Sequence, residues 1–178
     1  VKRIVIGKYK KNIREKLSKT INDKYDLAII SANPYTNSLI EASKIISNKN
    51  LNAKILFKLH PNENSIKEDI FKSFKEYKNI NIFDSEEPIE NILMLSPRIL
   101  VVQSTTTYNA LESNKEIYIL PKYDYHIHED MFKLNNVHIL DESMSIDLSN
   151  KTYSRFLEGT IFFDDFKISD DIKKLIEI

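Results

Sequence analysis

Two stretches of four consecutive apolar residues, LAII at 27–30 and ILVV at 99–102, constrain the fold of this chain more than any other feature. Neither stretch alternates apolar with polar residues, as a strand with one solvent-facing side does. Uninterrupted apolar strands are typical of parallel sheets that helices cover on both faces. The sequence therefore predicts a sheet that is buried on both sides.

Amphipathic helical patterns lie between the strand patterns. The predicted strands are residues 2–6, 26–32, 53–59, 79–83, 98–103, 116–120 and 137–140. The predicted helices are residues 12–21, 37–47, 65–77, 89–95, 106–113 and 168–178. Alternation of strands and helices predicts an α/β fold. We therefore expect one Rossmann-like α/β domain over residues 1–178, with its core at 26–140 and a closing segment with a C-terminal helix at 141–178.

The composition excludes several kinds of site. The chain has no cysteine, which rules out disulfides, thiol catalysis and cysteine-ligated zinc. It has two glycines, too few for a Walker A loop or a G-x-G-x-x-G motif, so a bound phosphate must be held by helix starts and side chains. Acidic and basic residues balance at 26 each, which gives no overall attraction to nucleic acid.

Two polar clusters follow predicted strands directly. Residues 60–63 (HPNE) follow the strand at 53–59, and residues 104–107 (STTT) follow the strand at 98–103 and open a helix. In an open α/β sheet, ligands bind beyond the carboxyl ends of the strands. Backbone N–H groups at a helix start, surrounded by hydroxyls, suit a phosphate. These clusters therefore predict a phosphate site, although hydroxyl residues at a helix start also serve simply as caps.

His60 is the candidate catalytic residue of this predicted site. Because Pro61 follows it, His60 is held in extended geometry at the tip of its strand. There its imidazole would donate a hydrogen bond to a phosphate or stabilise a departing one. The alternative is a histidine that satisfies a loop carbonyl. Ser31 and Asn33, at the end of the strand at 26–32, are candidates to line the same crevice, and Lys58 is a candidate source of positive charge.

Two further polar segments lie outside these clusters, at 33–37 and 126–130. The NPYTN sequence at 33–37 is a turn signal, with Thr36 or Asn37 expected to cap the following helix. The HIHED sequence at 126–130 resembles a zinc site, but no third ligand stands at a recognisable spacing. We therefore predict no metal site.

The chain resembles the carboxyl-terminal, donor-binding domain of bacterial surface-polysaccharide glycosyltransferases of the GT-B fold, with the His-Pro and Ser/Thr motifs of capsule transferases and sialyltransferases. The resemblance covers residues 26–121. Its marks are the sequences SANP at 31–34, FKLHPNE at 57–63, STT with Tyr108 and Ala110-Leu111 at 104–111, NK at 114–115 and YILP at 118–121.

The resemblance implies a function and a set of residues. It implies transfer of a sugar from a CMP-, CDP- or UDP-linked donor to a glycan or lipid-linked acceptor, with no cofactor or metal required. Asn109 would take the place of a glutamate that clasps the ribose. The implied donor- and phosphate-binding residues are Ser31, Asn33, Lys58, His60, Pro61, Ser104, Thr105, Thr106 and Asn109.

The resemblance also implies what lies outside the chain. We expect the acceptor-side domain in a missing N-terminal region or in a partner chain. A homo-oligomer is compatible with the resemblance. No nucleic-acid partner is expected. We expect a cytoplasmic location, with at most peripheral association with the inner face of the bacterial membrane, since no apolar run approaches the ~20 residues of a membrane span. The alternatives are a nucleotide-sugar 2-epimerase-like domain and a non-catalytic half that a partner chain completes.

Overall fold

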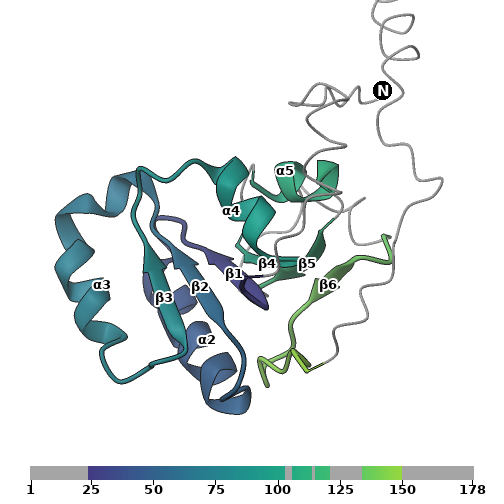
Figure 1. Cartoon of the computed structure of the whole chain (residues 1–178), viewed down its shortest axis with the longest axis horizontal. Coiled ribbons are helices and arrows are strands. Elements are labelled where there is room, and N and C mark those ends of the chain that lie inside the picture. Colours follow the sequence, from purple (N-terminus) through teal and green to yellow (C-terminus); the bar gives the residue numbers. More distant parts are fainter. Residues whose placement is uncertain (1–23, 103–105, 114, 121–133, 150–178) are drawn as a thin grey trace, which may run out of the picture.

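A computed structural model of the chain describes residues 24–102, 106–113, 115–120 and 134–149 (Figure 1). Within these ranges the elements, in chain order, are β1 Leu27–Ile30, α2 Thr36–Lys49, β2 Ile55–Lys58, the 3₁₀ helix η1 Pro61–Ile66, α3 Lys67–Ser73, β3 Ile80–Phe83, α4 Ile89–Leu95, β4 Arg98–Val101, α5 Thr106–Glu112, β5 Glu116–Ile119 and β6 Val137–Ile139.

The strands of the described residues form one six-stranded sheet in the order β3-β2-β1-β4-β5-β6. Every neighbouring pair is parallel, with Ile29 opposite Phe57 on one side of β1 and opposite Leu100 on the other. The prediction of a Rossmann-like parallel sheet is confirmed. The chain runs outward from β1 to β3, returns to β4 beside β1, and runs outward again to β6. The order reverses between β1 and β4, and this is the point at which open α/β sheets bind ligands.

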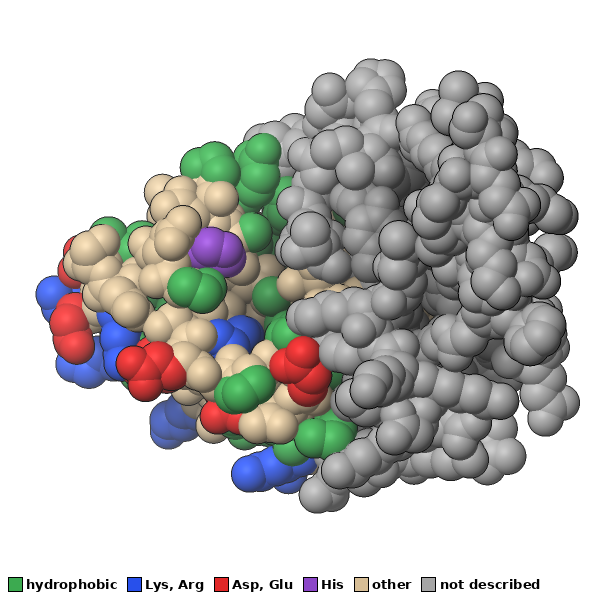
Figure 2. Space-filling model, turned by 90° about the horizontal axis from the view of Figure 1, so that it is seen from above, with side chains coloured by type: hydrophobic (Ala, Val, Ile, Leu, Met, Phe, Trp, Pro, Cys, Tyr) green, Lys and Arg blue, Asp and Glu red, His purple; other side chains and the backbone are tan. Residues whose placement is uncertain are grey.

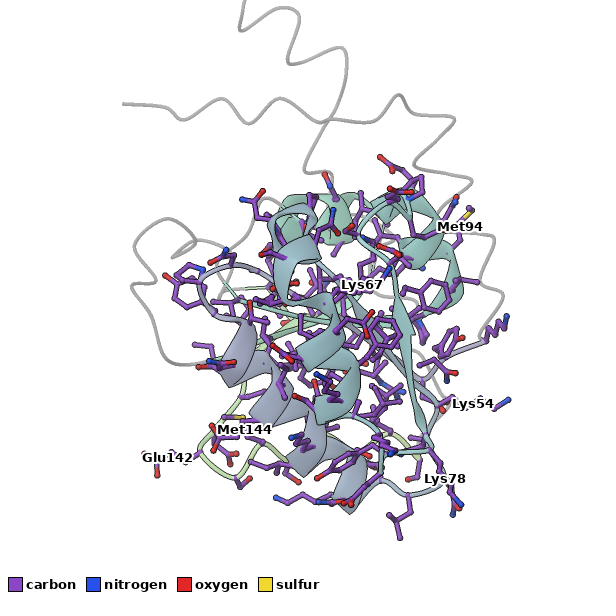
Figure 3. All side chains as sticks on the ribbon, turned by 90° about the vertical axis from the view of Figure 1, so that its left-hand side faces the viewer. Lys54, Lys67, Lys78, Met94, Glu142 and Met144 are labelled. Atoms are coloured by element: carbon purple, nitrogen blue, oxygen red, sulfur yellow. The ribbon has the colours of Figure 1, made fainter. Side chains whose placement is uncertain are left out.

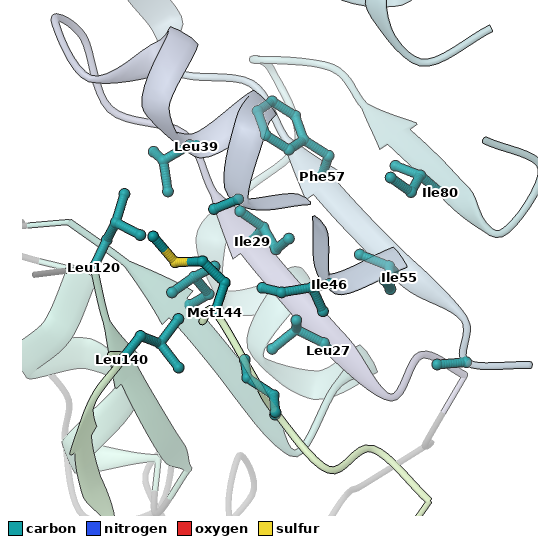
Figure 4. Close-up of a cluster of buried hydrophobic side chains, with 14 of the residues drawn as sticks. Leu27, Ile29, Leu39, Ile46, Ile55, Phe57, Ile80, Leu120, Leu140 and Met144 are labelled. Atoms are coloured by element: carbon teal, nitrogen blue, oxygen red, sulfur yellow. The ribbon is translucent and has the colours of Figure 1, made fainter. Parts of the chain in front are cut away.

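Helices cover both faces of the sheet, as the apolar strands predicted. Because successive side chains of a strand point to opposite faces, Leu27 and Ile29 pack with α2 and α3, while Ala28 and Ile30 pack with α4 and α5. Figure 4 shows the first of these layers, with Leu39 and Ile46 of α2 over β1. All four residues of β1 are buried, so β1 is a central strand with both sides shielded from water.

Residues 141–149 contain no helix or strand and run along the α2 side of the sheet. Met144 packs with Leu120 and Leu140 in the first apolar layer (Figure 4). The Lys49 ammonium at the end of α2 donates to the backbone carbonyl of Ser143. This segment therefore covers the part of the first face that α2 and α3 leave open.

The two ends of the sheet are lined by different residues. Lys54 and Lys78 precede β2 and β3 and lie toward the amino end, whereas Lys67, which follows β2, lies toward the carboxyl end (Figure 3). None of the helices in the described ranges is long and apolar enough to cross a bilayer.

The structure corrects several predicted boundaries. The helix predicted at 65–77 starts four residues earlier, as η1, because Pro61 at its first position needs no hydrogen-bond partner for its nitrogen. It ends early, because the Phe74 N–H bonds to Phe71 in a tighter turn. The prediction that Thr36 or Asn37 caps α2 was wrong: the N-cap is Tyr35, which makes no side-chain cap, and the Thr36 hydroxyl donates to Glu63. The elements predicted at 2–6, 12–21 and 168–178 lie outside the described residues.

Phe57 tests the packing of the first apolar layer. Its side chain is fully buried, and its ring centroid lies 4.9 Å from that of Phe74. We expect Phe57→Ala to lower the free energy of unfolding by about 3–5 kcal/mol, measured by chemical denaturation. Leu51→Ala is the control, because Leu51 is 75% exposed; its effect should stay below about 0.5 kcal/mol. Equal effects of the two substitutions would contradict this packing.

Candidate functional site

The carboxyl ends of β1, β2 and β4 lie at one end of the sheet, because the three strands are parallel. His60 follows β2, the loop at 31–35 follows β1, and Thr106 begins the helix that follows β4. Since β1 lies between β2 and β4, its loop is flanked by the two predicted motifs. Ser104 and Thr105 lie outside the described residues.

His60 is half-buried, and hydrogen bonds hold both its backbone N–H and its imidazole ring. Its backbone is extended, with φ −79° and ψ 147°, as expected before a proline. Its backbone N–H donates to Oε2 of Glu63 at 2.7 Å, and its ring nitrogen Nδ1 accepts the backbone N–H of Asn62 at 3.1 Å. Because Nδ1 is an acceptor, the proton of the neutral ring is on Nε2. Among the described residues, Nε2 has no hydrogen-bond partner.

Glu63 is fully buried, although its neighbours Asn62 and Asn64 are exposed. Oε1 accepts the hydroxyl of Ser31 at 2.6 Å and the hydroxyl of Thr36. Oε2 accepts the backbone N–H of His60. A buried carboxylate is stable only when hydrogen bonds replace its water, and these donors come from three segments: the end of β1, the start of α2 and the start of η1. One side chain thus joins the loop after β1 to the loop after β2.

Lys58 is turned away from open solvent. Its side chain is only 5% exposed, and its ammonium donates to the backbone carbonyls of Leu59 and Ser85, both at 2.8 Å. Ser85 belongs to the loop that follows β3. The ammonium therefore ties the ends of β2 and β3 together, and two of its three protons are already used.

The other predicted residues differ in exposure. Ser31 is buried and bonded to Glu63, whereas Asn33 and Pro61 are exposed at the carboxyl end of the sheet. Thr106 is half-buried, and Asn109 is 7% exposed on α5. Among these residues Asn33 and Pro61 are the exposed ones, whereas the Ser31 hydroxyl is occupied by its bond to Glu63.

The two loops at the reversal of strand order carry no charged side chain. Residues 31–38 and 102–110 contain only neutral residues, several of them with hydroxyl or amide groups. The carboxylate that contacts these loops is that of Glu63, which is fully buried and accepts the hydroxyls of Ser31 and Thr36. Seen from above (Figure 2), acidic and basic side chains are interspersed over the described part, without a continuous basic patch.

A hollow of about 480 Å³ lies at the opposite end of the sheet. Residues that precede β1 and β2 line it, together with the end of the described segment; they are Lys24, Asp26, Lys49, Asn50, Leu51, Asn52, Ala53, Lys54, Leu148 and Ser149. It shares no residue with the predicted site. The described residues also contain no group of three His, Asp or Glu side chains that could hold a metal ion, and residues 126–130 lie outside them.

Glu63 is the one residue described at this site for which the sequence predicted no individual role. A signal was present, because an N-cap residue followed three positions later by glutamate is a capping-box pattern. Here His60 takes the position usually held by Ser or Thr, and both reciprocal bonds of the box are present. The link from Glu63 to Ser31 and Thr36, across 32 and 27 positions, has no local signal.

No family model matches the chain, and no curated protein matches it significantly. Two solved structures of UDP-GlcNAc 2-epimerase from Methanocaldococcus jannaschii have a similar fold. One aligns over 94% of this chain with a TM-score of 0.55 and 18% identity. The other, in complex with UDP-GlcNAc and UDP, aligns over 94% with a TM-score of 0.57 and 16% identity. At such identity the likeness shows the fold, a Rossmann-like domain resembling one half of a GT-B enzyme. The chain spans about half the length of these structures.

The burial of the Lys58 ammonium can be tested by measuring the stability of the chain as a function of pH. Burial lowers its pKa below the usual value, and the charges of Asp84, Glu87 and Glu63 oppose this only in part. Between the lowered pKa and the ordinary value of 10.5, the unfolded chain binds more protons than the folded chain, so the cost of burying the ammonium falls as pH rises. We expect denaturation curves to show wild type gaining stability relative to Lys58→Met as pH rises toward 10.5.

The control for this test is Lys54→Met, because Lys54 is exposed. The difference in unfolding free energy between wild type and Lys54→Met should stay flat over the same pH range. A flat difference for Lys58→Met as well would show that the ammonium is not buried.

Proposed function

We propose that this chain is the donor-binding half of a glycosyltransferase that builds a bacterial surface polysaccharide, and that it binds a nucleotide sugar at the carboxyl end of its sheet. The observation that carries the proposal is the position of His60 beside the reversal of strand order between β1 and β4. The fold likeness to an epimerase solved with UDP-GlcNAc and UDP supports a nucleotide-sugar ligand. So does the resemblance of the HPNE and STT sequences to donor-binding motifs.

The proposed binding mode uses neutral donors. The Nε2–H of His60 would donate to a phosphate oxygen, and Ser104, Thr105 and Thr106 would supply hydroxyls from the other side of the β1 loop. Several donors that converge on an anion stabilise it more than solvent-exposed charges do, because they need no reorganisation. Asn33 and Pro61 would form the open wall beside them, and Asn109 would lie nearest the ribose.

The proposed reaction is displacement at the anomeric carbon. The bond between this carbon and the phosphate oxygen of the donor breaks while an acceptor oxygen bonds to the carbon. The electron pair of the broken bond goes to the nucleotide phosphate, where the donors around His60 stabilise it. A base must remove the acceptor proton. We assign that base to a second domain or partner chain, in keeping with the twofold greater length of the structural neighbours. No metal is required by this scheme.

A second candidate is a nucleotide-sugar 2-epimerase-like activity, which the fold of the structural neighbours favours. Conversion of a UDP-sugar in the absence of any acceptor would favour this candidate. Binding without turnover, even with the second domain or partner present, would point instead to a non-catalytic half.

Binding of free nucleotides tests the proposal directly. Calorimetry with CMP, CDP, UDP and GDP should detect binding of at least one of them, and His60→Ala should weaken it by about tenfold, as expected when a hydrogen bond to a charged group is lost. His138→Ala is the matched control, because His138 lies on β6 beside Glu116, away from β1 and β2. The proposal fails if the folded chain binds none of the four nucleotides, or if both substitutions weaken binding equally.

A further inference from the structure

The buried carboxylate of Glu63 stands out among the groups to which the proposed function gives no part. Glutamate is almost never fully buried unless it is paired, yet Glu63 is fully inside at an exposed turn. Its three donors lie on three segments that all end or begin at the carboxyl end of the sheet. A residue that only started the helix would need one of these contacts, the bond to the backbone N–H of His60.

The two bonds from hydroxyls to Glu63 link His60, the candidate catalytic residue, to the loop beside the reversal of strand order. Ser31 ends β1 and Thr36 begins α2, so together they bracket the loop at 31–35 that lies between the two predicted motifs. The backbone N–H of Ser31 also bonds to the carbonyl of Lys58 at 2.9 Å, which brings the ends of β1 and β2 together. Displacement of Glu63 would therefore release both His60 and the loop that faces it.

The ring of His60 depends on the same arrangement. Glu63 fixes the backbone at His60, and the Asn62 N–H then reaches Nδ1. A histidine ring with one nitrogen accepting a backbone N–H has its other nitrogen protonated when neutral. The orientation and the tautomer of the ring are thus set by contacts that are complete before any ligand arrives.

We propose that Glu63 is a positioning residue that holds His60, as its Nε2–H tautomer, and the loop at 31–35 in one fixed arrangement for binding a nucleotide phosphate. The role in phosphate binding rests on the proposed function, whereas the effect on the His60 tautomer does not. Glu63 touches neither ligand nor reacting atoms in this proposal. It acts through the backbone of His60 and the hydroxyls of Ser31 and Thr36.

The test compares Glu63→Ala with Glu63→Gln. Alanine removes all three contacts. Glutamine keeps the shape: its carbonyl can accept the His60 N–H, and its amide can donate to a hydroxyl, since hydroxyls both donate and accept. Two-bond ¹⁵N–¹H spectra of the imidazoles report the tautomer, and His60→Asn identifies the signal among the four histidines. Glu68→Ala, at an exposed position of α3, is the control.

We expect wild type, Glu63→Gln and Glu68→Ala to show the Nε2–H tautomer, and Glu63→Ala to show a mixture of both tautomers. Nucleotide affinity should fall about tenfold in Glu63→Ala and stay within about threefold of wild type in Glu63→Gln. A folded Glu63→Ala with a pure Nε2–H tautomer and wild-type affinity would overturn the proposal. If wild type binds no nucleotide, the proposed function fails, while the tautomer comparison still decides the positioning role.

A second variant covers the case in which Glu63→Ala does not fold. The double substitution Ser31→Ala with Thr36→Val keeps the carboxylate and its bond to His60 but removes both hydroxyls. The His60 tautomer should then stay Nε2–H, while nucleotide affinity falls by about threefold or more, because the loop at 31–35 is released. Unchanged affinity in this variant would show that Glu63 does not position the loop.

Discussion

The geometry at the carboxyl end of the sheet depends on the hydrogen bonds that the Glu63 carboxylate accepts. Its burial is costly unless each oxygen is satisfied, and here the satisfying groups are Ser31, Thr36 and the backbone of His60. Leaving a buried polar group without a hydrogen-bond partner costs about 1–3 kcal/mol, and more for a charged group. Separation of the three segments would leave the buried carboxylate without its donors, and this free-energy cost keeps the segments together. A loop-rich region thereby gains the fixed arrangement that its sequence, rich in small polar residues, would not supply.

The fold places this arrangement beside the reversal of strand order, where open α/β sheets bind ligands. The parallel strands bring their carboxyl ends together, and the reversal of order between β1 and β4 separates the loops that follow them. Lys58 joins the ends of β2 and β3 from within, through the carbonyl of Ser85, and so adds no open positive charge. The loops that follow β1 and β4 carry uncharged side chains, among them the exposed amide of Asn33 and the half-buried hydroxyl of Thr106.

Much of the fold could be predicted from the sequence, because local pattern determines it. The uninterrupted apolar runs required strands buried on both faces, and the helix predicted at 89–95 is observed at those residues. The burial of Lys58 and the bonds from Ser31 and Thr36 to Glu63 could not be predicted, because they depend on partners supplied by other segments. Ser31 stands 32 positions from the carboxylate that it bonds. A lysine at a strand end looks solvent-exposed in a sequence, and only the loop after the neighbouring strand buries it. Strand order likewise depends on tertiary packing.

We propose that a nucleotide binds at the carboxyl end of the sheet, between the loops after β1, β2 and β4. Titration of the ¹⁵N-labelled chain with UDP, followed through its backbone amide signals, tests this claim most directly. We expect saturable shifts at residues 31–35, 60–63 and 106–109, with the amino end of the sheet unaffected. Shifts confined to the hollow around Lys24 and residues 50–54 would contradict it, because that hollow lies at the opposite end of the same strands.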